Sequence, residues 1–176
     1  MLPADYARWQ TLLTHTYFDG RADQPIVMFI DRDDIHELGD AGEDAPRSLA
    51  MAVRRLVDVG RGASMFADVE RLQSSWSRGA RAEPPPTLPV LALSVLAASE
   101  MRSDSEGARH NYYVRLARSM LPDGSDNDIE LLRYNLSQRG AFVRVAGMWR
   151  RLHEWLGEQD GAFGTSTIPA NPAWSR

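Results

Sequence analysis

The chain has 176 residues, of which 43% are hydrophobic and 25% charged, a composition typical of one folded domain. It contains no Cys, and all 20 basic residues are Arg. These absences exclude disulfides, thiol catalysis, Cys-ligated metal centres, Schiff-base chemistry and a P-loop Lys. The formal net charge of −4 argues against a general affinity for DNA or acidic membranes. The sequence shows neither a secretion signal nor an apolar run of about 20 residues, so we expect a cytoplasmic protein without a membrane partner.

Helical periodicity and helix-capping signals recur along most of the chain. The apolar spacing predicts about seven helices, one of them central and apolar on all sides. They are expected over residues 3–17, 45–59, 63–76, 87–101, 108–121, 128–136 and 142–156, with one further helical turn over residues 33–38. The sequence therefore predicts a mainly α, single-domain helical bundle with at most one or two short strands.

The helix over residues 87–101 carries the strongest fold prediction. Thr87 is expected to be its N-cap, and the helix that follows is apolar all round. In a water-soluble domain only a helix that is enclosed on every side has this pattern. We therefore expect Leu91 and Leu96 to be buried.

One segment, residues 25–30, reads as a buried strand because it is a short β-branched apolar run between polar residues. A single strand cannot satisfy its own backbone hydrogen bonds and needs a partner. The two candidate partners are residues 142–145 and residues 165–168. With no further strands in view, the sequence does not support a parallel sheet.

The helical domain is expected to span residues 1–157, followed by an extended Gly- and Pro-rich tail over residues 158–176. We expect this tail to lead into a further domain of a longer protein. It carries Phe163 and Trp174, and large aromatic side chains are common anchors of protein interfaces. The tail is therefore a candidate docking segment for another domain or protein.

A cluster of carboxylates, Asp31, Asp33 and Asp34, directly follows the expected strand. Acids at the end of a buried strand are able to hold Mg²⁺ for phosphoryl transfer, and Asp31 and Asp33 have the Asp-x-Asp spacing of haloacid dehalogenase-type phosphohydrolases. Those enzymes usually also use a Lys, which this chain lacks. We favour helix capping by Asp33 or Asp34, with the acids orienting a basic protein partner.

Four Arg residues near the end of the chain support an alternative, a DNA-binding accessory domain. Arg139, Arg144, Arg150 and Arg151 lie on or next to the expected last helix. Two or three phosphate contacts are possible from such a helix. Because the chain is net acidic, we favour a solvated helix face instead. His153, on the same helix, is expected to be a partly buried structural residue.

The order of several core segments resembles the N-terminal region of large actinobacterial proteins, some of which are similar to multidomain antiviral-defence components. The resemblance rests on residues 25–31, 88–101, 111–116 and 148–156. It carries no catalytic residue, and the sequence shows no constellation of nucleophile, base or metal ligands. We therefore expect a non-catalytic interaction and assembly module of a larger bacterial protein, without cofactor or metal; a Mg-dependent phosphoryl-transfer enzyme using Asp31 and Asp33 is the second alternative.

Overall fold

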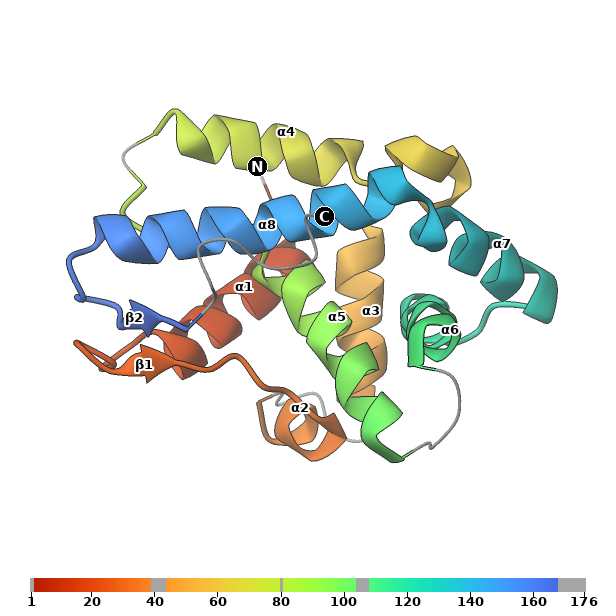
Figure 1. Cartoon of the computed structure of the whole chain (residues 1–176), viewed down its shortest axis with the longest axis horizontal. Coiled ribbons are helices and arrows are strands. Elements are labelled where there is room, and N and C mark those ends of the chain that lie inside the picture. Colours follow the sequence, from red (N-terminus) through yellow and green to blue (C-terminus); the bar gives the residue numbers. More distant parts are fainter. Residues whose placement is uncertain (1, 39–43, 80, 104–107, 168–176) are drawn as a thin grey trace.

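A computed structural model of the chain describes residues 2–38, 44–79, 81–103 and 108–167 (Figure 1). Within these residues the chain is mainly helical, as predicted, with two short 3₁₀ segments, η2 and η3, and two very short strands. The helices are α1 (Ala4–Tyr17), α2 (Arg32–Leu38), α3 (Ala45–Arg54), α4 (Ala67–Ser77), α5 (Leu88–Ser99), α6 (Ala108–Met120), α7 (Asp126–Ser137) and α8 (Arg139–Glu158). The other elements are β1 (Pro25–Ile26), η2 (Val59–Ser64), η3 (Glu100–Ser103) and β2 (Thr165–Ser166).

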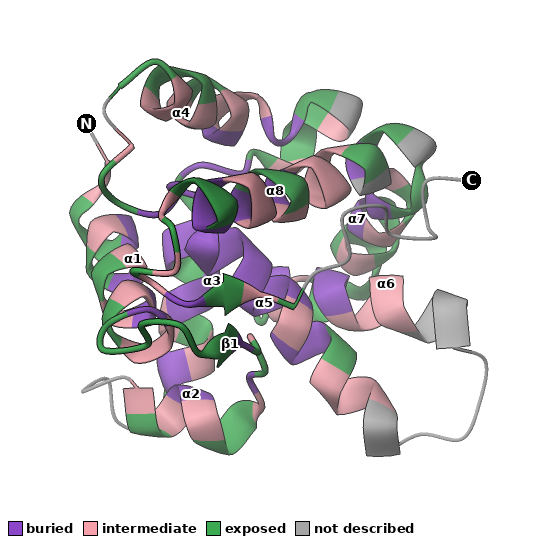
Figure 2. Cartoon of the chain, turned by 60° about the vertical axis from the view of Figure 1, so that its left-hand side comes forward, coloured by how far each residue is buried: buried purple, intermediate pink, exposed green. Residues whose placement is uncertain are grey.

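Helix α5 lies at the centre of the fold and packs against α1, α3 and α6. Nine of its twelve residues are buried, and Leu91 and Leu96 are 0% and 2% exposed. Figure 2 shows the buried residues concentrated in α3 and α5. The prediction of a helix enclosed on all sides is therefore confirmed.

The aromatic residues of α1 stabilise this core through hydrogen bonds as well as through apolar contacts. Tyr6 is fully buried, and its hydroxyl donates to the carbonyl of Pro86 at 2.8 Å, immediately before α5. Trp9 donates from Nε1 to Ser48 Oγ of α3 at 3.2 Å. Each buried donor thus has a partner on a neighbouring segment, which fixes the register of α1 against α3 and α5.

The expected buried strand is much shorter than predicted. Only Pro25 and Ile26 pair, and they pair with Thr165 and Ser166 in a parallel ladder, so the rejection of a parallel arrangement is wrong. Residues 27–30 continue without ladder pairing, and their burial alternates: Ile30 is fully buried, whereas Val27 and Phe29 are 65% and 39% exposed. The side chains of this apolar run are therefore buried on one face only, and the run does not need a second strand as a partner.

Several helix ends also differ from the prediction. α3 ends at Arg54 rather than at residue 59, and the 3₁₀ segment η2 begins at Val59. α7 is capped by Ser125, whose hydroxyl accepts from the amide of Asp128, so the helix begins at Asp126 rather than at residue 128. Thr87 precedes α5 as expected, but its buried hydroxyl forms no capping hydrogen bond. The cap positions follow backbone geometry that side-chain preference alone does not determine.

The chain turns back after α8 and returns to β1. The amide of Asp23 donates to the carbonyl of Gly161 at 2.9 Å, and the amide of Thr165 donates to the carbonyl of Gln24 at 2.7 Å. Thr167 donates from Oγ1 to the carbonyl of Ile26 at 2.6 Å. Up to residue 167, this part of the predicted tail is fixed to the beginning of the fold.

Helix α4 lies alongside α8 on the outside of the bundle, as both views show (Figures 1 and 2). Val69 is its only buried residue, although Met65 and Phe66 just before it are buried as well. Among the described residues no helix has the length and apolarity that crossing a bilayer requires. α4 is therefore held to the fold by few fully buried residues.

Candidate interaction surfaces

The acidic cluster that follows β1 forms a helix cap. Asp31 accepts the amide of Asp34 through Oδ1, and Asp34 accepts the amide of Asp31 through Oδ2, both at 2.9 Å. This reciprocal pair is a capping box that satisfies two backbone donors at the start of α2. Capping was expected from Asp33 or Asp34, but the N-cap is Asp31, and Asp33 lies exposed in the first turn.

Tyr17 lies next to this cap. Its hydroxyl donates to the carbonyl of Phe29 at 2.6 Å. Burial, reinforced by the charges of Asp34 and Asp31, raises the pKa of Tyr17 above its ordinary value. The carboxylates of the cap therefore help to keep the Tyr17 hydroxyl protonated, so that it remains a hydrogen-bond donor.

Of the four Arg residues proposed for nucleic-acid binding, two are held by carboxylates. Arg144 donates from Nη1 to Glu70 of α4 at 2.6 Å, and Arg151 donates from Nη1 to Glu154 at 2.8 Å. Arg150 is exposed, and Arg139 begins α8. The face of α8 is thus a mixed-charge surface, with one guanidinium linked across to α4.

The two aromatic residues of the predicted tail have different outcomes. Phe163 is partly buried against Trp155, with ring centroids 5.1 Å apart, and so already has an intramolecular partner. Trp174 lies outside the described residues. Close by, His153 and Ser166 are 2.9 Å apart from Nδ1 to Oγ, which confirms His153 as a partly buried structural residue.

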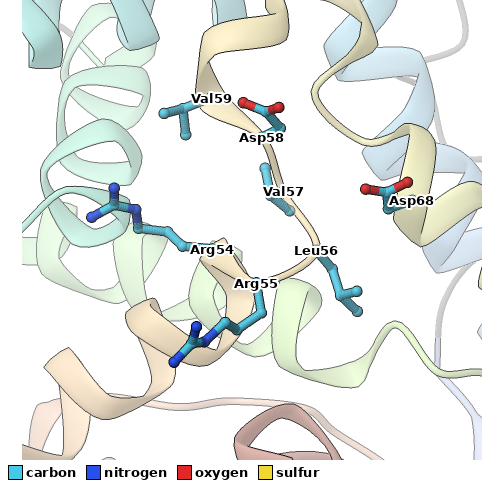
Figure 3. A pocket seen from close by; sticks show the side chains of 7 residues that line it. All are labelled: Arg54, Arg55, Leu56, Val57, Asp58, Val59 and Asp68. Atoms are coloured by element: carbon cyan, nitrogen blue, oxygen red, sulfur yellow. The ribbon is translucent and has the colours of Figure 1, made fainter. Parts of the chain in front are cut away.

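A small cleft of about 260 Å³ lies where the chain passes from α3 towards η2 (Figure 3). Figure 3 shows Arg54 and Arg55 at one end of this cleft, with Asp58 and Asp68 at the other. Three of these charges are matched by ion pairs, namely Arg55 with Asp5, Asp58 with Arg61 and Asp68 with Arg71. Because most of its charges are neutralised by partners outside the lining, this cleft does not define a ligand.

A larger groove of about 700 Å³ runs between α4 and α8, and we call it the α4–α8 groove. All the residues that line it have polar or charged side chains. They are Glu70, Gln73, Ser74, Ser77, Arg78 and Arg151. Sequence analysis missed this groove because its two walls are separated by more than 70 residues along the chain.

The outer face of α7 exposes two large apolar side chains, Leu131 and Tyr134, which are 58% and 57% exposed. A spacing of three residues places them side by side on the helix. The opposite face of α7 buries Leu132 and Leu136. These two side chains could be recognised from the sequence, because Leu131 and Tyr134 lie outside the apolar face through which α7 packs against the bundle.

The α7 face is also acidic. It begins with Asp126 and Asp128, both exposed, and continues with Glu130, which pairs with Arg133. Between Asp126 and Ser137 there are three acids and one Arg. We call the exposed surface formed by Leu131, Tyr134 and these acids the α7 face.

The described residues contain no group of three or more His, Asp or Glu side chains that is able to hold a metal ion. The chain matches no known family model, no curated protein and no solved structure. The surfaces described above are therefore the basis on which its function is considered.

Proposed function

We propose that this protein is a non-catalytic interaction module and that the α7 face binds a basic amphipathic helix of a partner protein or of another domain. The observation that carries the proposal is the pair of exposed side chains, Leu131 and Tyr134. Isolated exposed apolar residues are common on protein surfaces, but adjacent large ones mark interaction sites more often. Tyr is also among the residues most enriched at the energetic centres of interfaces.

The acids around this apolar pair support a partner of positive charge. Asp126 and Asp128 are exposed at the start of α7, at one end of the apolar pair. A partner helix with apolar residues on one face and Arg or Lys at its edges would match both features. Two copies of this chain meeting through the same face would instead bring like charges together, which disfavours a symmetric dimer.

The test is site-specific photo-crosslinking of the full-length protein in its native cells. A photoreactive residue is placed at position 134, and the same residue at position 51 is the control because Met51 is similarly exposed on α3. We expect position 134 to crosslink to a basic, helical segment of one protein. Adding Leu131→Asp should abolish that product, and position 51 should not form it.

A synthetic peptide with the sequence of the crosslinked segment then gives the affinity. Tyr134→Ala should weaken its binding by about 30-fold or more, the effect of removing a central interface anchor. An acidic crosslinked segment, a second copy of this chain, or a nucleic acid at position 134 would contradict the proposal. An unchanged affinity in Tyr134→Ala would contradict it as well.

A further inference from the structure

We propose that the α4–α8 groove is a second, independent binding site, which takes an extended acidic segment of a polypeptide. The groove has a volume of about 700 Å³, within the range of ligand sites in proteins. Its walls are α4 with Arg78 directly after it on one side and Arg151 of α8 on the other, and α4 buries only Val69 along its own length. Its position on the outside of the bundle gives a long ligand access (Figure 1).

The charges in and beside the groove favour an anionic ligand. Glu70 is neutralised by Arg144, and Arg151 shares its charge with Glu154. Among the described residues, the hydrogen-bond acceptors of Arg78 are neutral groups, the carbonyl of Ser74 at 3.2 Å and the hydroxyl of Ser75 at 3.5 Å. The groove therefore has an excess positive charge, although the chain as a whole carries −4.

The pair of Arg151 and Glu154 does not prevent Arg151 from contacting a ligand. Both side chains are exposed and lie three residues apart on one helix, and such pairs contribute little stability. Arg78 and Arg151 come from the two opposite walls of the groove. A carboxylate between the walls is able to accept charge-assisted hydrogen bonds from either guanidinium.

The uncharged lining residues fit a polypeptide backbone. Ser74 and Ser77 provide hydroxyl groups that both donate and accept. Gln73 adds an amide whose Nε2 is buried without a hydrogen-bond partner among the described residues. A small rotation of this side chain towards a ligand carbonyl would satisfy that donor.

The same lining argues against single-stranded nucleic acid as the ligand. Proteins that bind such strands stack their bases on aromatic side chains, and none of the described residues that line the groove is aromatic. Arg144, one of the four Arg residues that suggested nucleic-acid binding, already pairs with Glu70. The groove thus favours carboxylates on an extended chain.

The experiment measures binding of a fluorescently labelled 12-residue peptide of alternating Glu and Ser to the full-length protein. The variant Arg78→Gln/Arg151→Gln removes the two groove charges. Arg8→Gln/Arg118→Gln is the matched control, because it removes the same charge from exposed residues of α1 and α6. We expect binding that weakens with salt, a loss of about tenfold in the groove variant and no loss in the control.

A second readout places the peptide in the groove. The side-chain amide resonance of Gln73 should shift on titration in the parent protein and not in the groove variant. Equal loss of affinity in both double variants would overturn the proposal, because it would show only a general charge effect. A 12-nucleotide DNA strand that binds as tightly as the peptide, or no peptide binding, would overturn it too. None of these results depends on Leu131 or Tyr134, so they leave the α7 face to its own test.

Discussion

The closure of the C-terminal segment onto β1 depends on Gly164, and replacing this residue by Ala is expected to disrupt it. Gly164 has a φ of +94°, a backbone conformation that L-residues adopt only with strain. An added Cβ would lie 2.5 Å from Ile26 Cδ1 and 2.8 Å from the carbonyl oxygen of Gln24. The Ile26 side chain is able to rotate, but the Gln24 carbonyl accepts the amide of Thr165 and has little freedom to withdraw.

The expected cost combines two effects. Backbone strain of this kind costs about 1–3 kcal/mol, and forced overpacking costs about 1–3 kcal/mol. If residues 161–167 detach from β1 and so relieve the clash, part of this free-energy cost appears as local opening and not as a loss of global stability. Gly164→Ala should therefore lower the free energy of unfolding by about 2–4 kcal/mol, or expose the Thr165 amide to hydrogen exchange.

Urea denaturation followed by Trp fluorescence measures the global effect, since Trp155 packs against Phe163. Hydrogen exchange at Thr165 measures the local effect. Gly147→Ala is the control, because Gly147 lies within α8 and an added Cβ there meets nothing within 4 Å. This control should be neutral or stabilising by up to about 1 kcal/mol. A Gly164→Ala variant that is as stable as the parent, with Thr165 still protected, would refute the reasoning.

Three further predictions follow from single contacts. Asp31→Ala removes the capping box of α2 and should destabilise the protein by about 1 kcal/mol, whereas Asp33→Ala should have a smaller effect in the same urea titration. Tyr6→Phe leaves the carbonyl of Pro86 without its donor and should cost about 1–2 kcal/mol; an unchanged midpoint would show that this buried hydrogen bond is dispensable. Burial, with Tyr113 nearby, raises the pKa of Tyr112 to about 12, so the folded state holds a proton that the unfolded state loses above about pH 10. Tyr112 should not affect stability below pH 10, and between pH 10 and 12 it should contribute about 1 kcal/mol per pH unit to a fall in stability. Tyr112→Phe should remove that share of the slope in urea titrations at stepped pH, whereas Tyr6 and Tyr17, whose pKa values burial also raises, keep contributing to the fall.

The bundle around α5 could be predicted from the sequence because the information is local. A run such as Leu88–Ala97, apolar at nearly every position, has one stable environment in a soluble domain, the centre of the core. The β1–β2 pairing was harder, because it joins residues about 140 positions apart through a ladder of only two residues. Residues 165–168 were a correct candidate partner for β1, but no periodicity specifies a ladder that short or its direction.

The candidate surfaces also differ in how far they could be predicted from the local sequence. The carboxylates at residues 31–34 are conspicuous in the sequence, and in the structure Asp31 and Asp34 form a helix cap, a local role that short-range spacing indicates. The α4–α8 groove could not be predicted from the sequence, because no sequence pattern indicates that two distant helices form a groove. The α7 face lies between these cases: the apolar residues Leu131 and Tyr134 can be recognised in the sequence, but only their exposure in the structure distinguishes an interface from a second core contact.

The two proposed surfaces differ in how firmly the fold holds them, and this difference bears on how each would bind. α7 packs against α6 and α8 and buries Leu132 and Leu136, so the α7 face is presented by a fixed helix. A fixed face suits a partner helix, since neither side has to reorganise on binding. α4 fully buries only Val69, packs Leu72 and Trp76 partly against the core, and is linked to α8 by the Glu70–Arg144 pair. The α4–α8 groove lies on the outside of the bundle and has a polar and charged lining, so it suits an extended segment that is selected by charge rather than by shape.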